Sequence, residues 1–546
     1  MKRHNRELHV IFGVIALLFL TFLAVPVLKL FGKSFLDNSI TTEFYTSVLH
    51  SKGFGRALGN SFRVSAAAAV LATTIAFVIA YAIHYTRIAR PLKQALQAIA
   101  TLPMYLPTIT YGFAIIYSFG KQGLLTQVFG RQLFNIYGFG GLLLGYVIYT
   151  VPVAFLLIHN TMQFVDKKTL VVSKTMGDNA LSTFWIAVLR PLMGTLVGAF
   201  IQAFFLCFTD FGIPASVGGK YDVIATTLYN EMLGGVPDFN RGAVVAVIML
   251  LPSILSILLL RWLERYNIRY DRISDAELRH DPVRDLCWGG AGTVLMLVVL
   301  AVFAVIFVVP LVQNWPYRTS CTLEHFQSVF ADSDLRSVYM HSIIIALLTA
   351  LFGTLLAYGA ALITARSTLS RGCKQIVDSI ALVTNTIPGM VLGVAFLFFF
   401  SGTPLQNTFP LLIVCNMVHY FSTSYLMMKN ALSKMNAGWE TTAMLMGDSW
   451  PKTILRVVTP NAASSLIEVF SYYFINAMVT ISALVFIAGA RTMVLTTKIK
   501  QLQYINKYNE VFVLSLLILA TNLIAKVVFS RLANTCSKRT TSKCKG

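Results

Sequence analysis

The chain has 546 residues, of which 56% are hydrophobic and only 12% charged, and its mean hydropathy is +0.69. These values exclude a water-soluble globular protein of this size and predict an all-α protein that crosses a membrane many times. The net charge of +21 comes from Lys and Arg residues dispersed over loops, so we expect anionic membrane lipid as a partner, and no nucleic acid.

A helix of about 20 apolar residues crosses a bilayer, and the sequence predicts about twelve such spans. In chain order they are expected near residues 9–31, 61–85, 96–119, 136–160, 193–215, 240–260, 287–313, 341–364, 378–401, 409–428, 464–488 and 510–530. Lys and Arg concentrate in the loops that lie on the same side of the membrane as the N-terminus. Since basic loops stay in the cytoplasm, both termini are predicted to be cytoplasmic. Four basic residues fall on the predicted outer side, so either their loop folds back into the membrane or the span at 464–488 is misplaced. They are Arg491, Lys498, Lys500 and Lys507.

The two halves of the sequence repeat each other, because four landmarks recur in the same order. Asn60-Ser61 recurs as His341-Ser342, 281 positions later (342 − 61), and Pro107 and Gly112 recur as Pro388 and Gly393 at that offset. Met176-Gly177-Asp178 recurs as Met446-Gly447-Asp448 at an offset of 270 (447 − 177). Gln202, Phe204, Phe208 and Ser216 match Glu468, Phe470, Phe474 and Ser482 at an offset of 266 (468 − 202). The first copy therefore has an insertion of about eleven residues between its second and third landmarks.

Six spans per copy predict two six-helix halves that run through the membrane in the same direction. The expected divisions are a first helix and outer loop at 1–50, a first transmembrane domain at 51–261, a basic cytoplasmic linker at 262–286, a second leading helix and outer loop at 287–335, a second transmembrane domain at 336–532 and a basic tail at 533–546.

Two predicted cytoplasmic loops, residues 170–192 and 439–461, have the pattern of a helix, a Gly-Asp turn, a second amphipathic helix and a proline that opens the next span. Glycine permits the left-handed turn that ends the first helix, and the aspartate is expected to cap the second by accepting from its free N–H groups. A cap between two helices is an ordinary feature in a single loop. Its occurrence in two equivalent loops favours a shared function.

These loops resemble the signature of permease subunits of type I ATP-binding-cassette importers, the EAA loop, which has the pattern E-A-A, three residues, Gly, about nine residues and I-x-L-P. Gly177 and Gly447 match the signature glycine, and Pro191 and Pro460 the proline. The acidic head departs from the pattern: it is Val171-Val172-Ser173 in the first copy and Thr441-Thr442-Ala443 in the second, with Glu440 one place early.

The resemblance implies that these loops couple the chain to an ATPase. Asp178 and Asp448 belong to the same coupling turns. It implies as partners two copies of an ATP-binding-cassette ATPase subunit and an extracytoplasmic solute-binding protein, and as location the bacterial inner membrane. Residues 208–232 and 474–490 are most similar to the fused permeases of the iron(III) and 2-aminoethylphosphonate uptake group, so either solute is expected.

An ionisable group inside a span is costly and therefore a functional candidate. Asp210 and Glu468 qualify, and Asn476 is expected at the position of Asp210 in the second half. Alternatively, Asp210 caps a short re-entrant helix, and Glu468 faces the bundle and bonds to a hydroxyl. Pro107 and Pro388 break spans at matching points, which marks either a translocation path or packing kinks.

The sequence contains no G-x-x-x-x-G-K-[ST] phosphate loop, no HExxH spacing and no Ser/His/Asp set, and its seven cysteines have no CxxC spacing. We therefore expect no enzymatic activity, cofactor or metal site in this chain, with ATP hydrolysis on a partner. The alternative is an ion-coupled secondary transporter with two parallel repeats, which would bury more ionisable groups and would have no use for paired docking loops.

Overall fold

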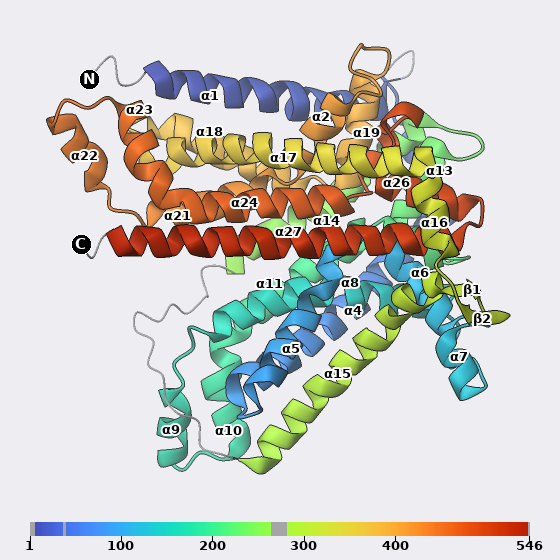
Figure 1. Cartoon of the computed structure of the whole chain (residues 1–546). Coiled ribbons are helices and arrows are strands. Elements are labelled where there is room, and N and C mark those ends of the chain that lie inside the picture. The colour runs from blue at the N-terminus through green and yellow to red at the C-terminus, as the bar shows by residue number, and fades with distance from the viewer. Residues whose placement is uncertain (1–5, 37–39, 264–280, 544–546) are drawn as a thin grey trace. The chain divides into compact units, whose positions relative to one another are not determined.

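The computed structural model describes residues 6–36, 40–263 and 281–543 (Figure 1). Within these ranges nine helices are long and apolar enough to cross a membrane, or up to twelve if three bent pairs each count as one span. The one sheet in the same ranges is a hairpin of β1 (Val312–Asn314) and antiparallel β2 (Arg318–Cys321), with Val312 opposite Cys321. The expected all-α polytopic fold is confirmed. Most of the predicted linker at 262–286 lies outside the described residues.

The described chain forms two compact units. Unit 1 comprises Met1–Tyr45, Glu231–Leu250 and Phe326–Gly546, and unit 2 comprises Thr46–Asn230 and Leu251–His325. Each unit therefore combines the body of one sequence half with the leading helix of the other half. This exchange was not expected from the sequence, which indicates where a helix begins and ends but not which bundle it packs against.

Unit 2 contains the body of the first half and the leading helix of the second. Its main helices are α4 (Lys52–Tyr85), α5 (Arg90–Thr101), α6 (Thr108–Phe119), α7 (Leu124–Phe129), α8 (Phe139–Met162), α9 (Lys168–Thr175), α10 (Ala180–Phe184), α11 (Arg190–Thr209), α12 (Gly212–Val217), most of α13 (Ile224–Leu233), the second half of α14 (Phe239–Leu263) and α15 (Pro282–Val308). The leading helix α15 packs on α4, where the rings of Tyr81 and Trp288 lie 4.4 Å apart.

Unit 1 contains the body of the second half together with the N-terminal helix. Its main helices are α1 (Arg6–Phe19), α2 (Val25–Phe35), most of α16 (Glu324–Ala331), α17 (Ser333–Arg366), α18 (Arg371–Thr386), α19 (Gly389–Phe400), α20 (Phe409–His419), α21 (Phe421–Ser433), α22 (Gly438–Leu445), α23 (Trp450–Thr453), α24 (Thr459–Val479), α25 (Leu484–Ile487), α26 (Leu495–Tyr504) and α27 (Tyr508–Lys543). The leading segment packs on α19, where the rings of Phe22 and Phe400 are 5.5 Å apart.

Three of the predicted spans are broken rather than continuous. The span predicted at 409–428 bends by 55° between Phe409–His419 and Phe421–Ser433, and two others turn more sharply. The chain turns by 111° between Arg90–Tyr105 and Thr108–Phe129, and by 103° between Arg371–Thr386 and Gly389–Phe400. Pro107 and Pro388 stand directly before α6 and α19 and have extended backbone conformations. A proline cannot donate the helical hydrogen bond and clashes with the preceding turn, so a break at these positions is the expected result.

The landmark Ser61 and its repeat Ser342 have the same structural role. Ser61 Oγ accepts from the backbone N–H of Ile224 at the start of α13, and Ser342 Oγ accepts from that of Leu495 at the start of α26, each at 2.8 Å. These N–H groups have no partner inside their own helices, and the serine of a neighbouring long helix supplies one. The repeat in sequence thus preserves a tertiary contact.

The basic loop near the end of the second half folds back onto its own unit. The predicted span 464–488 is wrong in its bounds, because α24 ends at Val479 and is followed by the short α25 and by α26, which packs against α27. Lys498 in α26 pairs with Asp334 at the start of α17, at 2.6 Å. Of the two alternatives, the structure shows that the predicted span was misplaced, and re-entry of this loop into the membrane stays a prediction.

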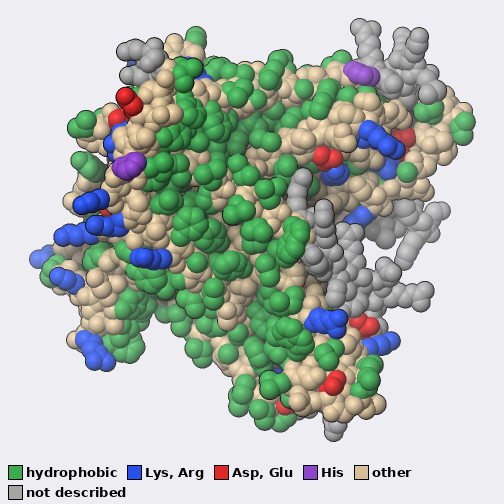
Figure 2. Space-filling view, turned by 180° about the vertical axis from the view of Figure 1, so that it is seen from behind, with side chains coloured by type: hydrophobic (Ala, Val, Ile, Leu, Met, Phe, Trp, Pro, Cys, Tyr) green, Lys and Arg blue, Asp and Glu red, His purple; other side chains and the backbone are tan. Residues whose placement is uncertain are grey.

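Hydrophobic side chains are abundant on the face shown in Figure 2, and the Lys and Arg side chains in view are gathered in a few places. Within unit 1, α1 begins and α27 ends at the end of the bundle that holds α22 and α23 (Figure 1). The start of α1, the end of α27 and the second Gly-Asp loop thus lie at one end of this unit, and the membrane side that they face stays a prediction.

Candidate functional site

The first Gly-Asp loop is a helix-turn-helix made of α9 and α10. Gly177 has a φ of +84°, the left-handed conformation predicted for it. Asp178 does not cap the second helix, because Asn179 occupies the N-cap position and accepts from the N–H of Ser182 at 2.8 Å. Asp178 instead accepts from the hydroxyl of the buried Ser173 at 2.5 Å and so fastens the turn to α9.

The second Gly-Asp loop has the same backbone turn with different side-chain contacts. Gly447 has a φ of +80°, and the N–H of Asp448 donates to the carbonyl of Ala443 at 2.9 Å, a bond that closes the C-terminus of α22. The expected cap is absent here too, because Asp448 pairs with Lys452 one turn later in the chain. The Ser449 N-cap of α23 makes no side-chain cap bond. The helix-turn-helix prediction is confirmed in both loops, and the assignment of Asp178 and Asp448 as helix caps is wrong.

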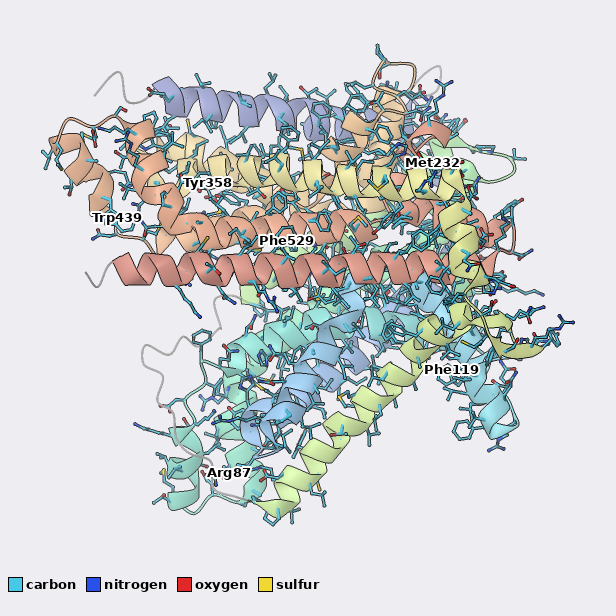
Figure 3. All side chains as sticks on the ribbon, viewed as in Figure 1. Arg87, Phe119, Met232, Tyr358, Trp439 and Phe529 are labelled. Carbon is cyan, nitrogen blue, oxygen red and sulfur yellow. The ribbon has the colours of Figure 1, made fainter. Side chains whose placement is uncertain are left out.

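A buried ion pair ties the second loop to the end of α17. Arg366 Nη2 lies 2.5 Å from Glu440 Oε2 and its Nε 2.6 Å from Oε1, while the arginine also donates to the carbonyls of Met435 and Asn436 at 3.0 and 2.8 Å. The Arg366 side chain is 3% exposed and that of Glu440 16% exposed. The guanidinium also lies 6.0 Å from the centre of the Trp439 ring, beside α22 (Figure 3).

The sequence pattern pointed to Glu440, but no motif pointed to Arg366 as its partner. The first loop has no equivalent ion pair. Tyr85 stands at the position of Arg366 (366 − 281) and Leu170 at that of Glu440 (440 − 270). The two loops are therefore held by different chemistry, a buried ion pair in unit 1 and a hydroxyl–carboxylate contact in unit 2.

Both loops present large apolar side chains to the surface. Met176 and Leu181 are 80% and 81% exposed on either side of the first turn, and Leu445 and Met446 are 85% and 79% exposed at the second. Exposed apolar side chains gathered on a loop with a fixed backbone are typical of a protein–protein contact. Each loop therefore presents exposed apolar side chains on a fixed backbone turn.

The second helix of each loop continues into the next membrane helix without a break. α10 passes into α11 through one π-helical turn at Trp185–Leu189, and α23 passes into α24 through Ile454–Val458. Pro191 and Pro460 are in the first turn of α11 and α24. Because proline lacks an N–H, the widened turn before it accommodates the missing bond. The amphipathic helix that was expected to be separate is thus an extension of the candidate span, which runs over Ala180–Thr209 in the first half and Trp450–Val479 in the second.

Asp210 is buried between α11 and α12, and its carboxylate accepts hydrogen bonds from backbone N–H groups. Its Oδ2 accepts from the N–H of Ile213 at 2.9 Å, and Gly212 and the Thr108 side chain also bond to it. This is the geometry of a helix cap, the alternative reading of this residue.

Asn476 is not the counterpart of Asp210 in the second half. α11 ends at Thr209 and α24 at Val479, so the residue after each helix is Asp210 in one half and Thr480 in the other.

The corrected offset is 270 (480 − 210), equal to that of the Gly-Asp turns. One matched contact agrees with it: Gly212 lies against Thr108 in unit 2, and Ser482, at the same offset, lies against Gly389 in unit 1, whereas Ser216 and Ala483, the neighbours of Gly112 and Gly393, differ by 267 (483 − 216). The offset of 266 differs from 270 by four residues, about one helical turn. A shift of one turn keeps the phenylalanines on the same face of the helix, which is why the sequence matched equally well in the wrong register.

Glu468 is exposed on α24. It does not face the interior of its bundle, so the expected bond to a bundle hydroxyl is wrong. Among the described residues no Lys or Arg pairs with it.

The helix breaks at Pro107 and Pro388 bring α6 and α19 into close contact with α12 and α25. A Cβ on Gly112 would lie 1.7 Å from Ser216 Oγ, and one on Gly393 would lie 2.4 Å from the Ala483 carbonyl oxygen.

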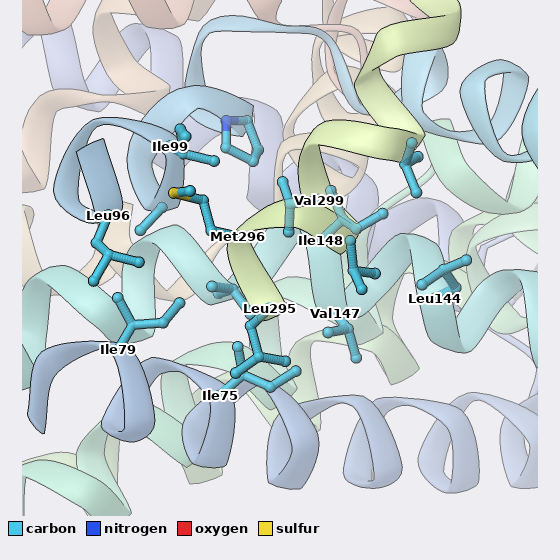
Figure 4. A pocket seen from close by; sticks show the side chains of 15 residues that line it. Ile75, Ile79, Leu96, Ile99, Leu144, Val147, Ile148, Leu295, Met296 and Val299 are labelled. Carbon is cyan, nitrogen blue, oxygen red and sulfur yellow. The ribbon is translucent and has the colours of Figure 1, made fainter. Parts of the chain in front are cut away.

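Unit 2 also holds a cavity of about 90 Å³ between α4, α5, α8 and α15 (Figure 4). The side chains that line it are apolar and include Ile75, Ile79, Leu96, Val147 and Val299. Such a lining offers no partner to a polar solute, so this cavity is a packing gap beneath α15 rather than part of a polar path.

Comparison with known proteins agrees with this architecture. The family described as binding-protein-dependent transport system inner membrane component matches residues 72–268 and 353–538. The second match begins 281 residues after the first (353 − 72) and ends 270 after it (538 − 268), the two offsets found in the repeat and in the structure.

Two relatives are similar over most of the chain. The "Putative ferric transport system permease protein FbpB 1" of Haemophilus influenzae is 26% identical over 88% of this chain and 78% of its own length. The "Ferric transport system permease protein FbpB" of Actinobacillus pleuropneumoniae is 25% identical over 89% and 72%. A "Spermidine/putrescine transport system permease protein PotC homolog" of Mycoplasma genitalium is 27% identical over 43% of this chain and 84% of its own. The chain therefore belongs to the inner membrane components of binding-protein-dependent transport systems, with two copies of the family domain in one polypeptide.

Proposed function

We propose that this permease moves ferric iron inward across the bacterial inner membrane, driven by ATP hydrolysis on two separate ATPase subunits and supplied by an extracytoplasmic binding protein. The observation that supports the energy source is the pair of coupling loops, α9–α10 and α22–α23, each with exposed apolar residues and each continuous with a membrane helix. Force applied to such a loop would reach the span directly.

The coupling residues on this proposal are those of the two turns. Gly177 and Gly447 set their shape, Glu440 holds the second loop to α17, and Pro191 and Pro460 mark the entry into the spans. Asp178 fastens the first turn to α9, and Asp448 has only an exposed pair, so we assign Asp448 a smaller effect.

The choice of solute rests on the names of the two relatives that match most of the chain, both of which are ferric transport permeases. We include 2-aminoethylphosphonate as the competing solute, because the sequence resemblance covers both. Pro107 and Pro388 lie where two spans break, and we place the translocation path beside these breaks. Asp210 contributes by capping α12 rather than by contact with solute.

The test is transport in proteoliposomes that contain the purified chain, a candidate ATPase and a candidate binding protein from the same genome. We expect uptake of ferric iron that requires ATP and both partners, and no ATP hydrolysis by the chain alone. Uptake that proceeds without an ATPase would refute the proposal in favour of an ion-coupled carrier, and ATP-dependent uptake of 2-aminoethylphosphonate instead of iron would refute the assigned solute.

Orientation is tested separately. Reporter fusions that are active only in the cytoplasm should be active at both termini. Activity at one terminus alone would contradict an even number of spans and with it the proposed cytoplasmic position of both coupling loops.

A further inference from the structure

Four polar side chains follow one face of α24, at the spacing of successive helical turns: Ser465, Glu468, Tyr472 and Asn476. At 100° per residue they lie within an arc of about 80° and rise over about 16 Å. Glu468 is exposed, and the other three are half-buried. The residues on the opposite face are buried, because α24 packs there against α17, α21 and α27. We call these four residues the α24 polar stripe.

Glu468 differs from the other carboxylates of the spans in its depth. Within the nine continuous candidate spans of the described chain, the other acidic residues lie in the first turn of a helix: Glu7, Asp285, Asp334 and Glu510. Glu468 is the tenth of the 21 residues of α24, about 14 Å from its inner end and about 17 Å from its outer end. A charge at that depth is costly in lipid, and such residues normally face a water-filled path.

The other side chains of the stripe also present oxygen atoms. The Asn476 amide Nδ2 donates to the Tyr472 carbonyl at 2.8 Å, which leaves its Oδ1 as the free acceptor. The Tyr472 hydroxyl already bonds to the Thr423 side chain of α21, so this phenol oxygen offers only its remaining lone pair, and Ser465 contributes a hydroxyl. Carboxylate, phenol, amide and hydroxyl oxygens are the ligands that hard cations prefer.

We propose that the α24 polar stripe is a relay of oxygen ligands that a small, hard metal cation follows during translocation, with Glu468 as the charged middle site. This inference rests on the proposed function, because it assumes that the chain is a solute path. It goes further by locating the cation-handling residues in the second half and by naming the solute class that they accept.

The relay is one-sided. At the corrected offset of 270, the positions of the stripe on α11 hold Thr195, Gly198, Gln202 and Leu206, which include no carboxylate. One charged site that is not enclosed binds weakly enough to release its cation, whereas a full cage of carboxylates would trap it.

The charge of the relay also selects against the competing solute. Neither α24 nor the interior of α11 carries a Lys, Arg or His residue to hold a phosphonate. The carboxylate of Glu468 would repel the phosphonate group of 2-aminoethylphosphonate. The same carboxylate would attract the ammonium group of that solute, so the preference of the stripe for a metal cation rests on the lack of a cationic side chain for the phosphonate.

The first test asks whether the stripe faces water. Single cysteines at Glu468, Tyr472 or Asn476, and at the buried Val469 as control, are introduced into the full chain and exposed to a charged, water-soluble thiol reagent. We expect the three stripe positions to react at least about tenfold faster than Val469, and ferric iron to slow them. Equal rates at all four positions would overturn the relay, because the stripe would then face lipid or protein.

The second test measures transport and ATP hydrolysis together in the complete reconstituted system. Glu468→Gln keeps the shape but removes the charge, and Glu510→Gln removes a carboxylate near the outer end of α27 in the same unit as a matched control. We expect E468Q to lower the rate of ferric iron uptake by about tenfold, with E510Q unchanged and ATP hydrolysis within about twofold of wild type in both. Wild-type iron uptake by E468Q would overturn the relay.

The two failures are distinguishable. If the wild-type complex takes up no iron, the proposed function fails before the relay is tested by transport, and the thiol measurements still decide whether the stripe faces water. If the wild-type complex takes up iron and E468Q does so equally well, the proposed function stands and the relay is wrong.

Discussion

The ion pair between Arg366 and Glu440 predicts that the second coupling loop depends on a single charged contact. Removal of one partner of a buried ion pair typically costs about 3–5 kcal/mol, because the other charge is left without its partner. Since Glu440 retains 16% exposure and Arg366 keeps two carbonyl acceptors, we take the lower value of about 3 kcal/mol for Glu440→Ala. That value corresponds to about a hundredfold shift toward release of α22 from the end of α17.

Hydrogen exchange of the α22 backbone amides measures this release directly. The matched control is Lys452→Ala, which breaks the exposed pair with Asp448 on the same loop and should cost less than about 1 kcal/mol. In a double-mutant cycle, Arg366→Ala combined with E440A should cost less than the sum of the single variants, because the double variant leaves no unpaired charge. If exchange in E440A equals that in K452A, the ion pair does not hold the loop and the reasoning is refuted.

Three further predictions concern glycines and a serine. Gly447→Ala puts a side chain at a φ of +80°, which should lower the free energy of unfolding by about 1–2 kcal/mol and reduce coupled transport. The control is Gly402→Ala, at a φ of +76° in an outer loop with equally open space. It should destabilise the protein by the same amount in thermal unfolding but leave coupling unchanged. Gly112→Ala would collide with Ser216 Oγ and should lower the unfolding temperature, and Ser216→Gly in the same chain should restore most of it. Ser342→Ala leaves the N–H at the start of α26 unpaired and should destabilise it by about 1–3 kcal/mol, measured as faster amide exchange there.

Each of these predictions has an opposing outcome. Equal loss of coupling in the Gly447 and Gly402 variants would mean that general destabilisation, not loop shape, is responsible. Failure of Ser216→Gly to restore the Gly112 variant would remove the proposed collision as the cause. Ser61→Ala is the counterpart of Ser342→Ala and should loosen α13 by a similar amount. A large difference between the two would show that the repeated contact is not equivalent in the two units.

Much of the functional architecture was accessible from the sequence because it depends on local chemistry. Apolar runs of sufficient length predict spans wherever they occur, and prolines predict where two of those spans break. Gly177 and Gly447 revealed both coupling turns because few other residues adopt a left-handed backbone easily. A local property of this kind does not depend on what the rest of the chain does.

The corrections share a different cause. The choice of Asn476 as the counterpart of Asp210 was wrong by one helical turn, since a shift of about 3.6 residues preserves every facial pattern and only the helix ends and the contacts of α12 and α25 fix the register. The assignment of Asp178 as a cap failed because the next residue, Asn179, is an equally good cap and the Ser173 hydroxyl binds the aspartate.

The sequence by itself thus determined that this chain is a duplicated helical membrane protein with two Gly-Asp turns, because hydropathy, proline and glycine act through the residues next to them. Only the tertiary structure decided that the leading helices α1–α2 and α15 pack with the opposite half, that Arg366 holds Glu440, and that Glu468 faces outward from its bundle. Those properties join residues far apart in the chain, and the free energy of packing one apolar helix face against another is nearly the same for many alternative partners.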